Sequence, residues 1–266
     1  MTTADGIGAP RIADRVADRV ADRVADRVAD RVADRVAAAR ARIAAAAARA
    51  GRDPDSVSLL AVTKTASAAQ IVVALAAGVA DFGENRVADA EARIADVAAL
   101  RAADDAPAAR PCWHFIGHLQ SNKARRAVAV FDRVDTIHSV PLADRLSALA
   151  GEAGRTLPVL LEVNIARDPA RSGFAPEAVA EAAGAVFALP HLRVDGLMGI
   201  APLTRDEAEQ RRAFALLRTL RQAVSERYPT QPLPTLSMGM SDDFEAAIGE
   251  GSTEVRLGRA LFAAEG

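Results

Sequence analysis

The sequence predicts an α/β fold, a (β/α)8 barrel preceded by an additional N-terminal helix. Two observations lead to this prediction. Short apolar runs alternate with longer helical stretches over most of the 266 residues, which is typical of parallel βαβ units. The apolar runs number eight, and eight parallel strands close a barrel. An open, doubly wound sheet is the alternative fold, because a strand count from one sequence is easily wrong by one or two.

The chain begins with a low-complexity segment. Residues 13–36 are six perfect copies of Ala-Asp-Arg-Val, and all four residue types tolerate a helix. On a helix of ~3.6 residues per turn the valine stripe rotates by ~40° per copy, so no single face docks along all six. We expect residues 1–36 to form a helical extension into solvent and residues 37–266 to form the barrel, with the first helix ending near Ala50-Gly51. A coiled-coil or partner segment is the alternative, but neither a seven- nor an eleven-residue repeat is present.

The predicted strands are short and apolar. They cover residues 57–62, 80–82, 113–116, 134–137, 159–165, 192–197, 235–236 and 253–257. The predicted helices between them cover residues 68–77, 85–100, 122–130, 142–153, 176–188, 205–227 and 242–248. In such a barrel the active residues follow the carboxyl ends of the strands, and a phosphate site is favoured after the seventh and eighth strands. Polar residues and glycines predominate at these positions, as a site requires.

The overall charge argues against a polyanionic partner. The chain has 33 basic and 35 acidic residues, so nothing in its composition favours nucleic acid or an anionic membrane. Its apolar runs are shorter than the ~18 residues of a membrane helix, and its first residues lack the pattern of a signal peptide. We expect a soluble cytoplasmic protein. The single cysteine, Cys112, excludes an intrachain disulfide and a zinc cluster built on thiolates, and no histidine spacing indicates a metal site.

Lysine is rare in this chain. Only Lys64 and Lys123 are lysines among the 33 basic residues, a bias that most simply reflects GC-rich coding. Where any cation would serve, the chain uses arginine, but only an amine can lose its proton and form a Schiff base. Lys64 closely follows the apolar run 59–62, so we expect its side chain to enter the barrel mouth, where partial desolvation favours a nucleophilic amine. A solvent-exposed lysine at a strand end is the equally weighted alternative.

A second candidate feature follows the last two strands. Residues 237–241, Ser-Met-Gly-Met-Ser, precede a predicted helix at Asp242, for which Ser241 is a good N-cap. Helix N-termini with small residues bind phosphate through backbone N–H groups, and the last strand adds Arg256 and Gly258 at the same end. A cap and a turn would explain the same residues without a ligand. Together, a Schiff-base lysine and a phosphate cradle suggest pyridoxal 5′-phosphate (PLP), an aldehyde that carries a phosphate.

Five segments resemble motifs of one known family, the pyridoxal-phosphate homeostasis proteins, whose barrel is that of the alanine racemase N-terminal domain. In chain order they are LLAVTKT, FGENRV, WHFIGHLQSNK, GLMGIAP and LSMGMSDDFEAAIGEGSTEVRLG. The resemblance covers about residues 37–266. It implies a PLP cofactor held as a Schiff base by Lys64 and a pocket lined by Asn85. It also implies that the phosphate and ring are held by Ser237, Gly239, Ser241, Arg256, Gly258 and Arg259.

Two positions depart from the family pattern. Arg259 stands where relatives often have a smaller side chain; its backbone N–H can still bind phosphate, and its side chain adds charge. His118 stands where some relatives have proline, a change that neither makes nor removes an obvious catalytic group. We expect Lys123, in the LQSNK segment, to be a second-site or structural lysine.

The resemblance favours a carrier of PLP over a catalyst. If Arg256 faces the pyridine nitrogen, as the matching arginine does in alanine racemase-like barrels, that nitrogen stays unprotonated and the ring is a weaker electron sink. Racemisation also needs a second base, which alanine racemases take from a separate domain. We expect Tyr228 to be structural, and His118 and His138 to have ordinary polar roles in preference to a catalytic one. The predicted function is therefore intracellular PLP homeostasis, with a PLP-dependent amino-acid racemase as the alternative.

The expected partners follow from this function. PLP itself is the first, and PLP-dependent apo-enzymes or amino acids are further candidates. The family resemblance makes a monomer the default.

Overall fold

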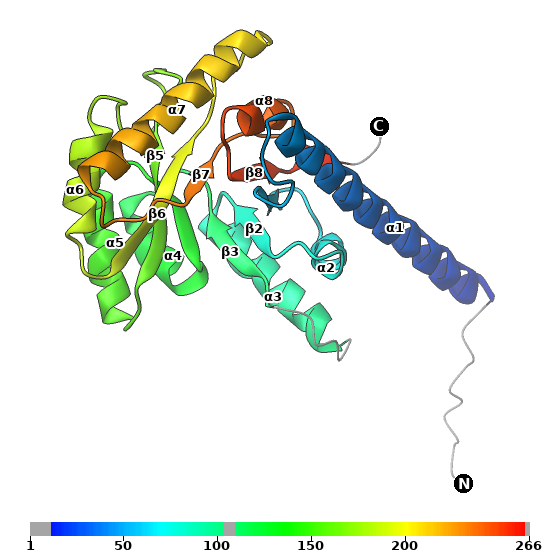
Figure 1. The fold of residues 1–266 in the computed structure, drawn as a ribbon. Coiled ribbons are helices and arrows are strands. Elements are labelled where there is room, and N and C mark those ends of the chain that lie inside the picture. Colours follow the sequence, from blue (N-terminus) through cyan, green and yellow to red (C-terminus); the bar gives the residue numbers. More distant parts are fainter. Residues whose placement is uncertain (1–11, 104–109, 264–266) are drawn as a thin grey trace.

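A computed structural model shows the protein as a closed barrel of parallel strands surrounded by helices (Figure 1). It describes residues 12–103 and 110–263, with the side chains of the first helix described from Arg31 onward. Each strand pairs in parallel with its neighbour in chain order, and the last strand pairs with the first. The prediction of a (β/α)8 barrel is therefore confirmed, and the open-sheet alternative is wrong.

All eight predicted strands are present, with small changes at their ends. They are β1 (Ser58–Val62), β2 (Asp81–Glu84), β3 (Cys112–Phe115), β4 (Arg133–Ile137), β5 (Leu157–Val163), β6 (Leu192–Gly199), β7 (Thr235–Ser237) and β8 (Glu254–Leu257). Ala61 of β1 is in register with Leu257 of β8, and Met198 of β6 is in register with Ser237 of β7. The residues that follow β6, β7, β8 and β1 therefore lie next to one another at one edge of the barrel.

The helices also agree with the prediction in the part of the chain that the structure describes. They are α1 (Ile12–Arg49), α2 (Ala68–Ala76), α3 (Val87–Ala103), α4 (Ala124–Val130), α5 (Val140–Glu152), α6 (Val179–Phe187), α7 (Glu207–Arg227) and α8 (Phe244–Gly249). The sequence did not indicate the last helix, α9 (Arg259–Phe262), because four residues are too few to show a periodic pattern. Within the described ranges, no helix is both long and apolar enough to cross a bilayer.

Aromatic side chains stiffen the part of the barrel that carries the first three strand ends. Phe82 of β2 packs on Trp113 of β3 with ring centroids 5.5 Å apart. Phe115 at the end of β3 meets Phe131, which follows α4, edge to face at 5.2 Å. Each of these rings is almost fully buried. Such contacts add to the stabilisation from apolar burial and hold the strand ends in fixed positions.

The second half of α1 is docked on the barrel. The helix lies beside α2 and α8 (Figure 1), and Arg40 donates to the carbonyl of Ala77 at the end of α2. Val32, Val36 and Ile43 are buried, so the last two copies of the repeat take part in the core. Two valines four residues apart differ by only ~40° around the helix and can share one face. The expectation that the whole repeat extends into solvent is therefore wrong for the last two copies. The domain boundary at residue 36 stays a prediction, and the side chains of the earlier copies lie outside the described residues.

Candidate functional site

One cavity at the carboxyl edge of the barrel brings together most of the predicted site. Its volume is about 390 Å³, and residues that follow β1, β6, β7 and β8 line it. The predicted site residues among them are Lys64, Ser241, Arg256, Gly258 and Arg259. The barrel thus places the strand-end lysine in the same cavity as the residues of the two last strand ends.

Lys64 is accessible while its main chain is held firmly. It lies two residues after β1, and its side chain is exposed. This exposure agrees with the alternative of a solvent-exposed lysine, and Lys64 also lines the cavity at the barrel mouth, as expected. That its surroundings favour a nucleophilic amine stays a prediction. The preceding residue, Thr63, is buried; its hydroxyl lies 2.6 Å from Oε1 of Glu84, to which it donates, and 3.2 Å from the carbonyl oxygen of Gly83.

The ion pair between Arg93 and Glu84, which sequence reasoning missed, holds the main chain around Lys64 in place. Arg93 of α3 donates from Nη1 to the carbonyls of Thr63 and Ala66, at 2.7 and 2.5 Å, and so spans the residues on both sides of Lys64. Its Nε lies 2.9 Å from Oε1 of Glu84, although the N–H is not aligned for a hydrogen bond. Burial raises the pKa of Glu84, against the opposing effects of the Thr63 hydroxyl and the Arg93 charge. The available sequence signal was Glu84 at a strand end and an arginine on the following helix.

Arg256 forms the floor of the cavity. Its buried guanidinium donates to the hydroxyl of Ser237 at 2.8 Å and to the carbonyl of Gly199 at 2.9 Å. Its backbone N–H donates to the carbonyl of Gly239 at 3.0 Å. Burial lowers the pKa of Arg256, while carboxylates around it, led by Glu254, raise it. Ser237 and Gly239 therefore support the floor through Arg256, and neither lines the cavity itself.

The loop after β7 requires glycine at one position. Gly239 has φ of +96°, and a Cβ there would lie 2.9 Å from Cα of Phe244 and 2.7 Å from Cβ of Ala247. The expectation that Ser241 caps a helix starting at Asp242 is wrong. The helix α8 begins at Phe244, and the Ser241 hydroxyl instead accepts a hydrogen bond from the backbone of Ala260 at 3.4 Å. Ser241 thereby links this loop to the start of α9.

The remaining predicted residues lie around the cavity in different ways. Arg259, at its rim, forms an ion pair with Asp242, and both side chains are largely exposed. Asn85 follows β2, is exposed, and does not line the cavity, so its place in a cofactor pocket stays a prediction. Lys123 is an exposed residue at the end of the short 3-10 helix Ser121–Lys123 and also lies outside the cavity lining.

The side chains considered as candidate bases, His118, His138 and Tyr228, do not line the Lys64 cavity. His118 and His138 stack on each other with ring centroids 4.5 Å apart, and His118 lines a separate cavity of about 580 Å³ together with Glu162. Burial lowers the pKa of His138, the carbonyl of Thr136 opposes this effect, and the nearby His118 adds to it. Tyr228 follows the end of α7, and its ring packs edge to face on Phe187 at 5.2 Å. The described structure therefore gives Tyr228 a packing role.

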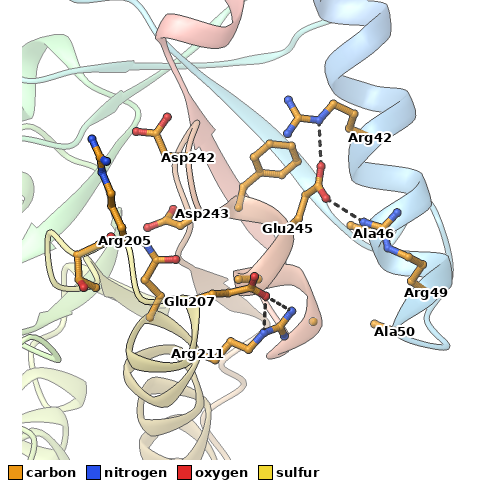
Figure 2. Close-up of a pocket in the computed structure, with 15 residues that line it drawn as sticks. Arg42, Ala46, Arg49, Ala50, Arg205, Glu207, Arg211, Asp242, Asp243 and Glu245 are labelled. Carbon is orange, nitrogen blue, oxygen red and sulfur yellow. Dashed lines mark hydrogen bonds and ion pairs between the residues drawn. The ribbon is translucent and has the colours of Figure 1, made fainter.

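A larger cavity, of about 1160 Å³, adjoins the Lys64 cavity between α1, α7 and α8 (Figure 2). The residues common to the two cavities are Thr204, Arg205, Gln210, Asp242 and Asp243. Several of its charged side chains pair with one another, as the dashed lines of Figure 2 mark. Arg42 and Arg49 each lie 2.9 Å from the Glu245 carboxylate, and Arg211 pairs with Glu207. Its lining contains no lysine, so the smaller cavity is the better candidate for amine chemistry.

The donors of the smaller cavity suit a small aldehyde that carries an anion. Lys64 supplies an amine, and Arg256 and Arg259 supply positive charge. Gly258 lines the cavity without a side chain, and a Cβ there would lie 3.3 Å from both Cβ and the carbonyl oxygen of Val62. A strand-end amine in one cavity with cations and a glycine from the last strand is an arrangement suited to a parallel barrel that binds a phosphorylated aldehyde.

Comparison with known proteins identifies the family. The model of the alanine racemase N-terminal domain matches residues 35–265. The pyridoxal phosphate homeostasis protein of Pseudomonas aeruginosa is 46% identical over 224 residues, which cover 84% of this chain and 91% of that protein. The protein of the same name from Escherichia coli K12 is 42% identical over 229 residues, 85% of this chain and 93% of that protein. The chain belongs to the alanine racemase N-terminal domain family and, within it, to the pyridoxal phosphate homeostasis proteins.

A solved relative extends this finding. PipY of Synechococcus elongatus, solved with PLP bound, superposes with a TM-score of 0.75 and is 38% identical; the match covers 87% of this chain and 100% of that chain. The resemblance stated from the sequence motifs is therefore confirmed at the level of family and fold.

Proposed function

We propose that this protein binds PLP at the Lys64 cavity, holds it as a Schiff base on Lys64, and contributes to PLP homeostasis in the cytoplasm without strong catalytic activity of its own. The observation that carries the proposal is the placement of Lys64 in one cavity with Arg256, Gly258 and Arg259. The relatives named as PLP homeostasis proteins and the PLP-bound PipY support it.

Each residue has a distinct part in this function. Lys64 offers its amine to the aldehyde, and its exposure leaves it reachable from solvent. The Ser241 hydroxyl, the backbone at Gly258 and the Arg259 guanidinium are the donors for the phosphate. Arg256, fixed by its bonds to Ser237 and Gly199, orients the ring. When bound, PLP supplies a reactive aldehyde and an electron-accepting ring.

An arginine floor disfavours catalysis that depends on the ring. A guanidinium stays protonated and donates hydrogen bonds but accepts none, so Arg256 provides no proton to the ring nitrogen and no acceptor for a protonated one. The bound PLP is then a store that exchanges with apo-enzymes or amino acids, and the protein works as a monomer.

An amino-acid racemase is the second candidate function. It would need an acid–base pair on two sides of the substrate, with Lys64 as one member. The stacked histidines His118 and His138 favour this alternative, because they follow β3 and β4 at the same edge of the barrel. His118 nevertheless lines a different cavity from Lys64.

Borohydride reduction followed by peptide mapping tests the Schiff base. The protein incubated with PLP is expected to show the visible absorption of a Schiff base, and reduction is expected to fix the cofactor on Lys64. Lys64→Ala and Lys64→Arg should lose the covalent product, while Lys123→Ala, which removes the other lysine of the chain, should retain it. A reduced product on Lys123, or one that persists in Lys64→Ala, contradicts the proposal.

A solvent-exchange experiment separates the carrier from the racemase. The PLP-loaded protein is incubated with L- and D-amino acids in deuterated water. The carrier function predicts no sustained exchange of the α-hydrogen and no change of configuration. Turnover that disappears in a His118→Gln or His138→Gln variant would establish the racemase instead.

A further inference from the structure

A cluster of metal-binding side chains lies at the opposite end of the barrel from Lys64. Asp81 is the first residue of β2, Cys112 is the first residue of β3, and His114 comes two residues later on the same face of β3. Asp81 and Cys112 are in register with each other. Because the strands are parallel, these residues lie toward the amino end of the barrel, whereas Lys64 follows the carboxyl end of β1.

The three side chains converge on one point. Nε2 of His114 lies 3.2 Å from Sγ of Cys112 and 3.1 Å from Oδ1 of Asp81, and one ligand atom from each residue lies within 4.8 Å of the others. Tetrahedral zinc with bonds of about 2.0 to 2.3 Å has ligand atoms roughly 3.3 to 3.5 Å apart. The two separations from Nε2 of His114 need to change by only a few tenths of an ångström, and that between Asp81 and Cys112 is below 4.8 Å.

Surrounding residues orient the histidine. Nδ1 of His114 lies 3.4 Å from Oδ2 of Asp135, which is fully buried. Arg133 holds Asp135 through two hydrogen bonds, of 2.6 and 2.9 Å, and also donates to Glu254. A carboxylate on the second nitrogen of a metal-binding histidine fixes the ring and increases the basicity of the nitrogen that faces the metal. Nε2 of His114 is therefore directed at Cys112 and Asp81.

The cluster is open to solvent on one side. The Asp81 side chain is 32% exposed and that of His114 only 2%, and Cys112 is partly exposed. Three protein ligands with an accessible fourth position match the coordination of zinc in sites that keep a bound water. A thiolate, an imidazole and a carboxylate together favour a borderline transition metal over calcium or magnesium.

We propose that Asp81, Cys112 and His114 form a binding site for a divalent transition-metal cation of the zinc type, separate from the Lys64 cavity. The sequence did not reveal this site, because Asp81 lies on a strand next to that of Cys112 and His114 and the three residues do not have the spacing of a known metal-binding motif.

Cobalt(II) is the spectroscopic probe for this site. Cys112 is the only cysteine of the chain, so a sulfur-to-cobalt charge-transfer band in the near ultraviolet reports on this site alone. Titration of the full-length protein is expected to give this band with one equivalent of cobalt, and zinc should displace it. Cys112→Ser should abolish the band, and Asp81→Asn should weaken binding on the order of tenfold or more. His138→Gln, which alters the stacked pair of His118 and His138, should leave the band unchanged.

A second measurement needs no variant. Zinc bound at the cluster should slow alkylation of Cys112 by iodoacetamide in the wild-type protein, and a chelator should restore the rate. Absence of the cobalt band together with an alkylation rate that zinc does not change would overturn the proposal.

Discussion

Replacing Arg93 by methionine tests the support beneath Lys64. Methionine keeps much of the apolar length of the side chain and removes the charge. The variant leaves Glu84, which is fully buried, without its cation. It also removes the two hydrogen bonds to the carbonyls of Thr63 and Ala66. A buried carboxylate that loses its partner must either remain charged at high cost or take up a proton.

Protonation sets the size of the effect. The ordinary pKa of a glutamate is about 4.3, and neutralising its carboxylate costs about 1.4 kcal/mol for each pH unit above that value. The largest cost of protonating Glu84 is therefore about 3.7 kcal/mol at pH 7 and about 1 kcal/mol at pH 5. The two lost hydrogen bonds add about 1 kcal/mol each at either pH. In the variant the folded state binds a proton that the unfolded state has released, so its stability falls as pH rises. The pKa of Glu84 is already raised in the wild type, so wild-type stability also falls over this range, and the destabilisation relative to wild type should grow by at most about 2.7 kcal/mol from pH 5 to pH 7.

Urea denaturation at the two pH values measures this difference. The double variant Arg93→Met/Glu84→Gln is the first control and should lose the pH dependence, because glutamine does not titrate. Arg126→Met is the second control. Its partner Glu91 and Arg126 itself are exposed, so the loss should be small and nearly the same at both pH values. A destabilisation by Arg93→Met that is the same at both pH values would refute the argument that Arg93 keeps Glu84 charged.

Three further predictions concern the rest of the molecule. The pKa of His114 is raised well above its usual value, since the carboxylates of Asp135 and Asp81 outweigh burial. Urea denaturation in the presence of a chelator should therefore show the full destabilisation by His114→Gln below about pH 6.5. This destabilisation should decline as pH rises through the pKa of His114 in the folded state. Gly239→Ala should cost about 1 to 3 kcal/mol more than Gly154→Ala in thermal denaturation, because both have positive φ but only Gly239 would clash; equal losses would exclude the clash. Arg259→Thr should weaken PLP binding several-fold in a fluorescence titration, on the order of 1 kcal/mol. Asp242→Asn should strengthen PLP binding, because it releases Arg259 from its ion pair. Equal weakening by both variants would mean that the ion pair stabilises the loop and that Arg259 does not bind the phosphate.

The sequence predicted those parts of the site that depend on position along one strand. Lys64, Ser241 and Gly258 follow strand ends and Arg256 is the penultimate residue of β8, and parallel strands in a closed barrel must bring such positions to one edge. The prediction that these residues share a cavity could therefore be made without knowing any side-chain contact. The rarity of lysine then indicated which cation at that edge has amine chemistry.

The missed features depend on neighbours that are distant in sequence. Arg93 reaches back from α3 to carbonyls 27 and 30 residues earlier, which no local pattern reveals. Ser241 was a good N-cap by residue type, but the turn continues to Asp243 and its hydroxyl pairs with α9 instead. Cys112 and His114 share a face of one strand, yet their relation to Asp81 appears only when β2 and β3 are paired. Contacts between residues distant in sequence decided each of these cases.

The exposure of Lys64 bears directly on the choice between carrier and catalyst. Enzymes that use a lysine as a base commonly bury it, because desolvation favours the neutral amine. Lys64 instead combines a rigid main chain, clamped by Arg93 and Thr63, with a side chain that solvent reaches. In the proposed function, the clamped main chain would hold the amine in one cavity with Arg256, Gly258 and Arg259, and the accessible side chain would leave a Schiff base open to water or to another amine. A store of PLP would need both retention of the phosphate and a covalent bond that reverses easily, and the proposed placement of Lys64 is compatible with both.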